Sequence, residues 1–373
     1  MGLPERQGRA ASGVENENAG GSRLPILHLP ESKLLISGVL PTYRMETVGV
    51  GFEPLDIDIL REMYRTGRVT VAGIDPRLNV SRIARRLHTS RTRVARRLRM
   101  WSESGFIQRY DVWPNPALLH LTGWTVNVRV TDRLDKPEFF RRLGAVDGAV
   151  SAVEFLGDWM SVQFVAPGEE TGKRRVELLR HLKGVAEVET PFPWRPLEPK
   201  GVLSPLDLRI LKALRDRPKG TLTEIARRVG VSTRTMTTRY GRLIENWAVW
   251  FVPVFDFTQL PLPLVNLNVW FEPGASSARL VETVMRQYPW TLEFGWGEFG
   301  PPDWQDFKTL FVTLPSIGAI EDLERLARSV PGTKDVEAIV MLRTHSFSGW
   351  LDEMLPRLSP PARRRPLRPD PTR

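Results

Sequence analysis

The chain has 373 residues, 41% of them hydrophobic, and its 53 Lys and Arg against 43 Asp and Glu give a formal net charge of +10. Cysteine is absent, which excludes disulfide frameworks, thiolate nucleophiles and cysteine-based zinc sites. The length predicts about two to four domains, and the charge favours a polyanion or an acidic membrane as partner. The absence of cysteine leads us to expect a cytoplasmic protein. No apolar run is long enough to cross a bilayer, and we expect no membrane partner.

The first segment, residues 1–50, begins MGLPERQGRAASGVENENAGGS. It lacks the continuous apolar centre of a signal peptide. Its small and polar residues predict that it is largely disordered.

Residues 51–116 have the pattern of a winged helix-turn-helix domain. LDIDILREM (55–63) is apolar at helical spacing, and SRIARRLHTSRTRVARRLRMW (81–101) contains two further stripes separated by a break at His88 and Thr89. The intervening GRVTVAGIDPRLNV is expected to be a loop. GFIQRYDVWP (105–114) predicts a short strand pair that forms the wing.

The helix after the break carries dense positive charge. If Val94, Leu98 and Trp101 are buried, its first two turns face outward, where arginines can pair with guanine edges or phosphates in a major groove. A merely solvated polar face is the alternative, whereas a membrane-surface helix would be longer and uninterrupted. The predicted DNA-binding residues are the N-cap Ser90 together with Arg91, Thr92, Arg93, Arg96 and Arg97.

Residues 118–192 follow with the order strand, helix, strand, strand, helix, strand. WTVNVRV, AVSAVEFL and WMSVQFV have the β-branched and aromatic content of strands, and the helices are expected at 136–144 and 169–183. This order predicts a ferredoxin-like split βαβ domain. The proline-rich residues 193–201 are expected to be a stiff linker.

The same succession then recurs. LDLRILKAL and TEIARRVGVSTRTMTTRYGRL predict a second winged helix-turn-helix at 202–260, with WAVWFVPVFD (247–256) as its wing, and residues 262–347 repeat the βαββαβ order. Residues 348–373 are expected to be a basic disordered tail. The matching DNA-binding candidates are Ser232, Thr233, Arg234, Thr235, Thr238 and Arg239.

The predicted fold class is therefore α+β, with two winged helix-turn-helix domains alternating with two ferredoxin-like domains. We expect the two sheets to pack on each other, so that one polypeptide forms an intramolecular pseudo-dimer, with further self-association left open. The more basic first copy would supply phosphate affinity, and the second copy would supply base discrimination.

Two weaker patterns are set aside. GWGEFG (295–300) satisfies a dinucleotide-binding spacing, but Pro301 and Pro302 follow where a helix N-terminus would be needed. The five histidines show no short metal-ligand spacing. We therefore predict no metal and no cofactor.

The second helical segment resembles the N-terminal domain of the Lrp/AsnC family of transcription regulators. The resemblance covers roughly residues 52–345 as two fused copies, and it implies sequence-specific binding to double-stranded DNA and response to a small effector such as an amino acid. In LGDWMSVQFV the family's Gly-Asp-aromatic turn is matched by Gly157, Asp158 and Trp159, which the resemblance implies as ligand-binding residues. The residues that carry the helical match are Leu206, Asp207, Ile210, Leu211, Ile225, Ala226, Ser232, Thr235, Arg239 and Leu243, with Leu55, Asp56, Ile59, Leu60, Ile83, Ala84, Ser90, Val94, Arg97 and GFIQRY in the first copy.

The main prediction is a transcription regulator that is not an enzyme. Two alternative functions stay open. Siroheme decarboxylases resemble the same family, and such an enzyme would need basic and histidine side chains around a tetrapyrrole. An architectural protein would use the basic surface to bind DNA without sequence preference.

Overall fold

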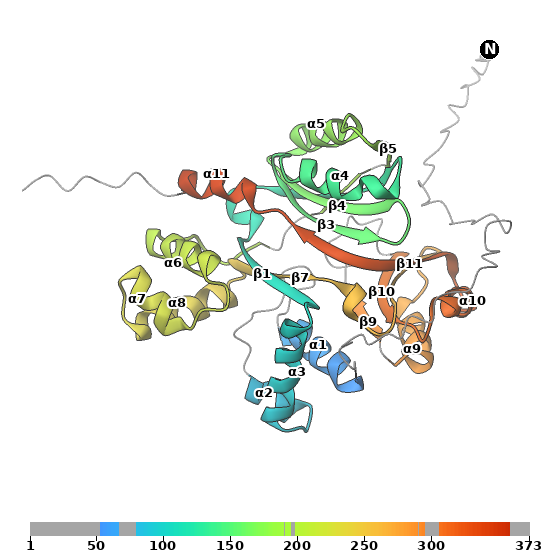
Figure 1. Ribbon diagram of the computed structural model, residues 1–373, viewed down its shortest axis with the longest axis horizontal. Coiled ribbons are helices and arrows are strands. Elements are labelled where there is room, and N and C mark those ends of the chain that lie inside the picture. Colours follow the sequence, from blue (N-terminus) through green and yellow to red (C-terminus); the bar gives the residue numbers. More distant parts are fainter. Residues whose placement is uncertain are drawn as a thin grey trace, which may run out of the picture. The chain divides into compact units, whose positions relative to one another are not determined.

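Six of the described helices form two groups of three, and most of the strands form one large sheet in the computed structural model (Figure 1). The structure describes residues 53–66, 80–189, 191–194, 198–289, 291–294 and 306–358. The predictions for residues 1–50, for the 67–80 loop except its last residue, for GWGEFG and for residues 359–373 lie outside these ranges.

The first helical group consists of α1 (Pro54–Thr66), α2 (Val80–Arg86) and α3 (Arg91–Glu103). The break predicted between α2 and α3 is present, and His88 adopts a positive φ of 48° there. Ser90 caps α3, because its side chain accepts a hydrogen bond from the Arg93 amide at 3.1 Å.

The second group consists of α6 (Pro205–Asp216), α7 (Leu222–Val229) and α8 (Thr233–Glu245). Capping boxes at Ser204 and Thr221 begin α6 and α7. Gly230 ends α7 in the left-handed conformation, with φ 76°, which a residue without a Cβ adopts at no steric cost. Ser232 then caps α8, so the predicted helix-turn-helix geometry is present here as well.

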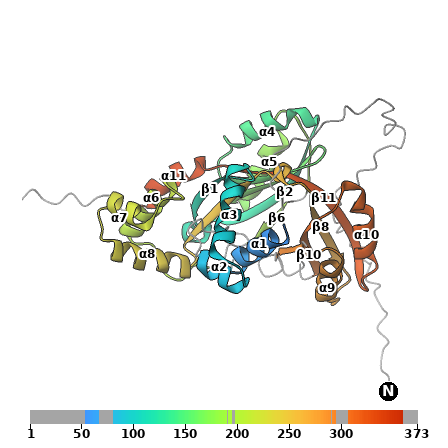
Figure 2. The same cartoon turned by 60° about the horizontal axis from the view of Figure 1, so that its bottom comes forward.

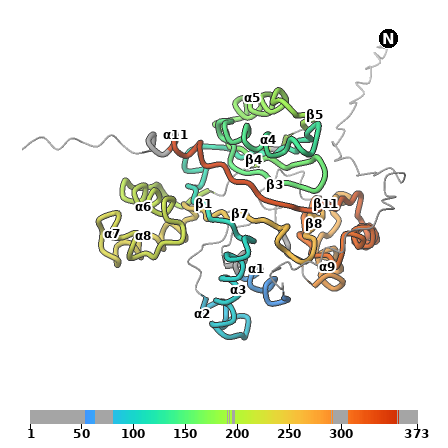
Figure 3. Tube along the Cα trace, viewed as in Figure 1, coloured from blue at the N-terminus to red at the C-terminus, as the bar shows by residue number. Residues whose placement is uncertain are grey.

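The strand that follows each helical group pairs with its counterpart in the other half of the chain. β1 (Ile107–Pro114) and β7 (Val249–Phe255) form an antiparallel two-stranded ribbon (Figure 3). The prediction of two separate wings is therefore wrong. Val112 of β1 packs in the core of the second helical group, and Phe255 of β7 contacts Phe106, next to the first group, at 5.1 Å between ring centroids.

The predicted order strand, helix, strand, strand, helix, strand is present in both halves. The first set is β2 (Thr122–Val130), α4 (Lys136–Leu143), β3 (Ala149–Phe155), β4 (Trp159–Ala166), α5 (Glu169–Arg180) and β5 (Val185–Val188). The second set is β8 (Leu264–Phe271), α9 (Ser277–Gln287), β9 (Thr291–Phe294), β10 (Phe307–Thr313), α10 (Ile320–Arg328) and β11 (Thr333–Ser346). Short 3-10 helices lie at Pro116–Leu119, Arg133–Asp135, Phe257–Gln259 and Ile317–Ala319.

The strand β11 joins the two sets of strands into one sheet with the order β5-β2-β4-β3-β11-β8-β10-β9. Its first half pairs with β8, and its second half, from Met341 to Ser346, pairs with β3. The expectation of two separate sheets that pack on each other is therefore wrong, because β11 joins the two sets edge to edge in one sheet. A strand of 14 residues is long enough to serve both partners in succession.

Helices α4 and α5 cover one face of the first set of strands, and α9 and α10 cover one face of the second set (Figure 2). Alternate strand residues such as Val126 and Val128 point to these helices, as the two-residue period of a strand requires. Gly172 of α5 lies so near Trp124 that a Cβ at this glycine would stand 2.1 Å from Trp124 Cε2. The absence of a side chain lets α5 contact the sheet directly.

Two segments expected to lack regular structure contain elements. In the predicted linker 193–201, Pro193 and Trp194 belong to β6 (Phe192–Trp194), which pairs with β2. In the predicted tail 348–373, residues 349–358 form α11 (Gly349–Leu358). Both corrections have the same cause, because Trp194, Trp350 and Leu351 are apolar side chains that become buried in one shared cluster.

The sheet face opposite α4, α5, α9 and α10 carries two carboxylates in matching positions. Glu189 accepts a hydrogen bond from Asn127 at 3.0 Å, and Glu337 accepts one from Asn268 at 3.2 Å. Burial is the main reason that the pKa of Glu337 is raised to about 8, and nearby Glu189 adds to the effect. An ionised Glu337 is therefore a cost to the folded state.

We expect Glu337→Gln to stabilise the protein in a pH-dependent way. The carboxyl has a pKa of about 8 in the folded chain against a usual value of 4.5, so its contribution to stability is complete below pH 4.5 and is lost as the pH rises through 8. The variant should equal the parent near pH 4.5 and exceed it at pH 9 by about 1–3 kcal/mol, allowing for partial exposure of the side chain. Denaturant unfolding across this range measures the difference, and Glu272→Gln at an exposed position is the control.

Candidate nucleic-acid interface

The exposed side of α8 presents hydroxyl and arginine side chains. Met236, Tyr240 and Leu243 are buried in the core of the second helical group, as the predicted stripe requires. The opposite side begins at the capped N-terminus, where backbone amides favour anions such as phosphate. The exposed residues are Ser232, Thr233, Arg234, Thr235, Thr237, Thr238 and Arg242.

Thr237 and Arg242 were not among the sequence candidates, although helical spacing indicates them. Thr237 lies four residues after Thr233 and donates to its carbonyl oxygen at 2.9 Å. Arg242 lies four residues after the candidate Thr238. Extending the exposed stripe by one turn would have found both.

The exposed side of α3 is more basic. Ser90, Arg91, Thr92, Arg93 and Arg96 are exposed as predicted, and Arg99 extends the same surface. Arg93 Nη2 lies 3.0 Å from Glu53 Oε2 and forms an ion pair with it. This hydrogen bond is the main reason that the pKa of Glu53 is lowered.

Arg97 is the exception, because its side chain is only 2% exposed. Its Nε donates to Asp56 Oδ1 at 2.6 Å, and its Nη2 donates to Asp56 Oδ2, so the guanidinium group binds the carboxylate through two bonds. Asp56 is fully buried and also accepts from Trp101 Nε1 at 3.0 Å. The prediction that Arg97 faces DNA is wrong.

Helix geometry explains the position of Arg97. It lies three residues after the buried Val94 and four before the buried Trp101, so it falls on the inner stripe of α3. Leu98, which was expected to be buried, is instead partly exposed. Asp56, 41 residues earlier in the chain, makes a charge on this stripe tolerable.

A looser version of this pair joins α6 and α8. Arg239 Nη1 lies 3.4 Å from Asp207 Oδ2, and the Arg239 side chain is 31% exposed. Asp207 also accepts from the backbone amide of Ser204 at 2.9 Å. Arg239 thus lies at the edge of the exposed surface, with one side turned to its aspartate.

The arginines on the two preceding helices vary in their surroundings. Arg86 of α2 pairs with the buried Glu62 of α1, and Arg228 of α7 pairs with Asp216 at 2.5 Å. Arg85 and Arg227 are exposed. Part of the charge of α2 and α7 therefore fixes them to the first helix of each group.

The turn between β3 and β4 holds the three residues implied as ligand contacts. Gly157 has φ 95°, a conformation that favours glycine. Asp158 Oδ2 lies 3.9 Å from Arg129 Nη1, and the Arg129 guanidinium lies 5.8 Å from the centre of the Trp159 ring. The structure brings Asp158 and Trp159 together around Arg129, and Trp159 is buried.

Other kinds of site find little support in the described part of the chain. Within it, no three His, Asp or Glu side chains gather as a metal ion would need. Among the described helices, none combines the length and the apolarity of a bilayer-spanning segment.

Comparison with known proteins identifies the second helical group. Residues 203–246, which contain α6, α7 and α8, match the winged helix-turn-helix DNA-binding family. A 120-residue stretch is 29% identical to an uncharacterized HTH-type transcriptional regulator from Pyrococcus furiosus, covering 31% of this chain and 79% of the relative. Residues 203–246 therefore form a DNA-binding helix-turn-helix.

Solved structures with similarity include the siroheme decarboxylase NirDL and AsnC from E. coli. NirDL aligns over 81% of this chain and 98% of its own, with 13% identity and a TM-score of 0.43. AsnC aligns over 41% of this chain and 97% of its own, with 15% identity and a TM-score of 0.26.

Replacement of Arg96 and replacement of its neighbour Arg97 should have very different effects on the stability of the first helical group. Arg97→Met leaves Asp56 buried without its cation and should destabilise the first helical group by about 3–5 kcal/mol. Arg96→Ala removes an exposed charge and should change stability by less than about 0.5 kcal/mol. Hydrogen exchange of the α3 amides measures both effects locally, and equally fast exchange in the two variants would contradict the assignment.

Proposed function

We propose that this chain is a sequence-specific DNA-binding transcription regulator of Lrp/AsnC type. The observation that carries the proposal is the match of residues 203–246 to a DNA-binding family, combined with the exposed Arg234 and threonines at the capped start of α8. A helix presented in this way can enter a major groove and read base edges.

The first helical group is proposed as a second DNA-binding unit derived by tandem duplication. In support, a serine caps both α3 and α8, and an Asp–Arg pair joins the first and third helices in both groups. The order of strands and helices that follows is also the same in the two halves. A buried ion pair such as Asp56–Arg97 gains little stability by itself, so the presence of a corresponding, more exposed pair at Asp207 and Arg239 favours a common origin over chance.

The two halves are proposed to act as an intramolecular pseudo-dimer. The ribbon of β1 and β7 links the helical groups, and the pairing of β11 with β3 links the strand units. Two DNA-binding units on one chain raise the effective concentration of the second once the first is bound. Because α3 is richer in arginine than α8, the recognised site should consist of two unequal halves.

The proposal includes a small effector that binds at the turn between β3 and β4. Gly157, Asp158 and Trp159 remain candidates for an amino-acid contact because they share one turn. The Asp158 carboxylate already faces Arg129, so an incoming ammonium group would have to share it.

Selection from a random pool of DNA duplexes tests the proposal. A regulator yields a recurring motif, whereas an architectural protein enriches no sequence. An enzyme related to the siroheme decarboxylases would bind a tetrapyrrole and show its visible absorption. Failure to recover any motif would reject sequence-specific regulation.

We expect Arg96→Ala and Arg234→Ala to weaken DNA binding in different ways. Loss of a phosphate contact at Arg96 should weaken binding to all sequences and reduce the slope of log K against log salt by about 1. Loss of a base contact at Arg234 should cost about 1–3 kcal/mol at a few positions and relax the preference there. Fluorescence anisotropy over a salt series measures both.

The control for these variants is Arg174→Ala, which removes an exposed arginine of α5, outside both helical groups. It should leave the motif and the salt slope unchanged. Equal behaviour of Arg96→Ala and Arg234→Ala would contradict the division of labour.

A further inference from the structure

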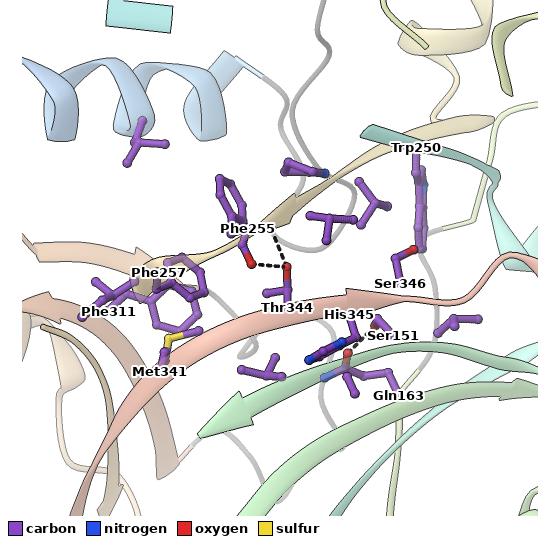
Figure 4. Close-up of a pocket in the computed structure, with 18 of the residues that line it drawn as sticks. Ser151, Gln163, Trp250, Phe255, Phe257, Phe311, Met341, Thr344, His345 and Ser346 are labelled. Atoms are coloured by element: carbon purple, nitrogen blue, oxygen red, sulfur yellow. Dashed lines mark hydrogen bonds between the residues drawn. The ribbon is translucent and has the colours of Figure 1, made fainter. Parts of the chain in front are cut away.

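A cavity of about 190 Å³ lies beside the ribbon of β1 and β7 (Figure 4). Its walls include Trp113 of β1, Trp250 and Phe255 of β7, Gln163 of β4 and Ser346 of β11. Ile57 and Leu60 of α1 also line it, so the first helical group, the ribbon and the large sheet all contribute residues to the walls. The cavity is separate from the turn at Gly157 to Trp159.

The size and the walls of the cavity suit one aromatic ring. An engineered cavity of about 150 Å³ with apolar walls binds benzene, so the larger volume here admits a ring with a small substituent. Trp113, Trp194 and Trp250 supply flat apolar surfaces for stacking. Trp194 reaches its place only because Gly123 has no side chain, since a Cβ there would lie 2.1 Å from Trp194 Cε2.

Four polar atoms of the lining side chains are buried without a hydrogen-bond partner within the described part of the chain. They are Trp113 Nε1, Trp194 Nε1, Thr313 Oγ1 and Ser346 Oγ. Such atoms are rare in folded proteins because each carries a desolvation cost that a partner would remove. An indole nitrogen can only donate, so the missing partner is a hydrogen-bond acceptor.

The charge of the lining restricts the ligand further. Among the described residues that form the walls, none is Asp, Glu, Lys or Arg. A zwitterionic amino acid would lose its hydration there, and the one ionisable residue among the described lining residues, His345, already lies 3.3 Å from Glu154 Oε2 through its Nε2. A neutral acceptor, such as an ester or carbonyl oxygen, meets the donors without this cost.

We propose that the cavity binds a small neutral aromatic compound with a hydrogen-bond acceptor, and that its occupancy alters DNA affinity. The second part rests on the proposed function. The physical link is the ribbon, because β1 follows α3 and β7 follows α8 within a few residues. Ile57 and Leu60 of α1 also line the cavity, so a bound ring touches the first helical group directly.

Methyl benzoate is a suitable probe because it is a neutral aromatic ester. Its binding is measured first on the full chain in the absence of DNA. At about a hundredfold excess over its dissociation constant, the probe should raise the thermal midpoint by about 3–8 °C. Indole N–H resonances of tryptophan should shift in ¹H–¹⁵N spectra as the donors gain an acceptor. Toluene, which lacks the acceptor, and phenylalanine, which is zwitterionic, should bind more weakly.

Variants of the lining distinguish a binding site from a packing defect. Thr313→Val removes a hydroxyl without a partner, so the free protein should keep or raise its thermal midpoint while methyl benzoate binds about 3- to 10-fold more weakly. Trp113→Phe should lower the affinity for methyl benzoate by a similar factor. Thr309→Val is the matched control, because Thr309 lies on the same strand, donates to Asn268 at 2.9 Å and does not line the cavity. It should lower the midpoint and leave probe affinity unchanged.

The outcomes separate the two parts of the proposal. The proposed binding site would be rejected if methyl benzoate did not bind. It would also be rejected if neither Thr313→Val nor Trp113→Phe changed the affinity for methyl benzoate. Binding that leaves DNA affinity within a factor of two would overturn the coupling alone. If no DNA motif exists, the proposed function fails while binding of the probe without DNA still supports the site.

Discussion

The pairing of β1 with β7 is the constraint on which the rest of the structure depends. Each strand follows a helical group and is largely buried along its length, so neither can remain exposed in an isolated half. When the strands pair, their backbone N–H and C=O groups form hydrogen bonds with each other. Val112 of β1 then packs in the core of the second helical group. Pro253 lies opposite Tyr110 in this ribbon and contributes no N–H to its backbone pairing. Residues of both halves consequently share two of the hydrophobic clusters.

The aspartates at the starts of α1 and α6 determine which arginines are available to a ligand. Asp56 engages Arg97 completely, and Asp207 engages Arg239 partly. Arg96 and Arg234 remain exposed, whereas Arg93, which is also exposed, pairs with Glu53, three residues before Asp56. Charge density alone therefore overstates the DNA-binding surface, because part of the charge holds the third helix of each group to the first.

Much of the fold could be predicted because its signals are local. The N-caps Ser90 and Ser232, the break after α2 and the alternation of apolar residues in β2 and β8 each depend on neighbours within a few residues. The errors concern residues whose partners are distant. Arg97 was misplaced because its partner lies 41 residues away, although the recurrence of an Asp and an Arg in both halves was a usable signal. Trp194 and Trp350 were assigned to a linker and a tail because only the assembled core gives them a surface to cover.

The sequence by itself determined which segments are helices and strands, their order in both halves, and the outward position of most candidates on α3 and α8. These properties follow from side-chain periodicity and capping, which act over single turns and strand repeats. The tertiary structure alone decided that β1 pairs with β7, that β11 joins the two strand sets, and that a cavity with unpartnered donors lies beside the ribbon. Strand pairing and cavities depend on contacts between residues far apart in the chain, and periodicity carries no information about which distant partner a strand selects.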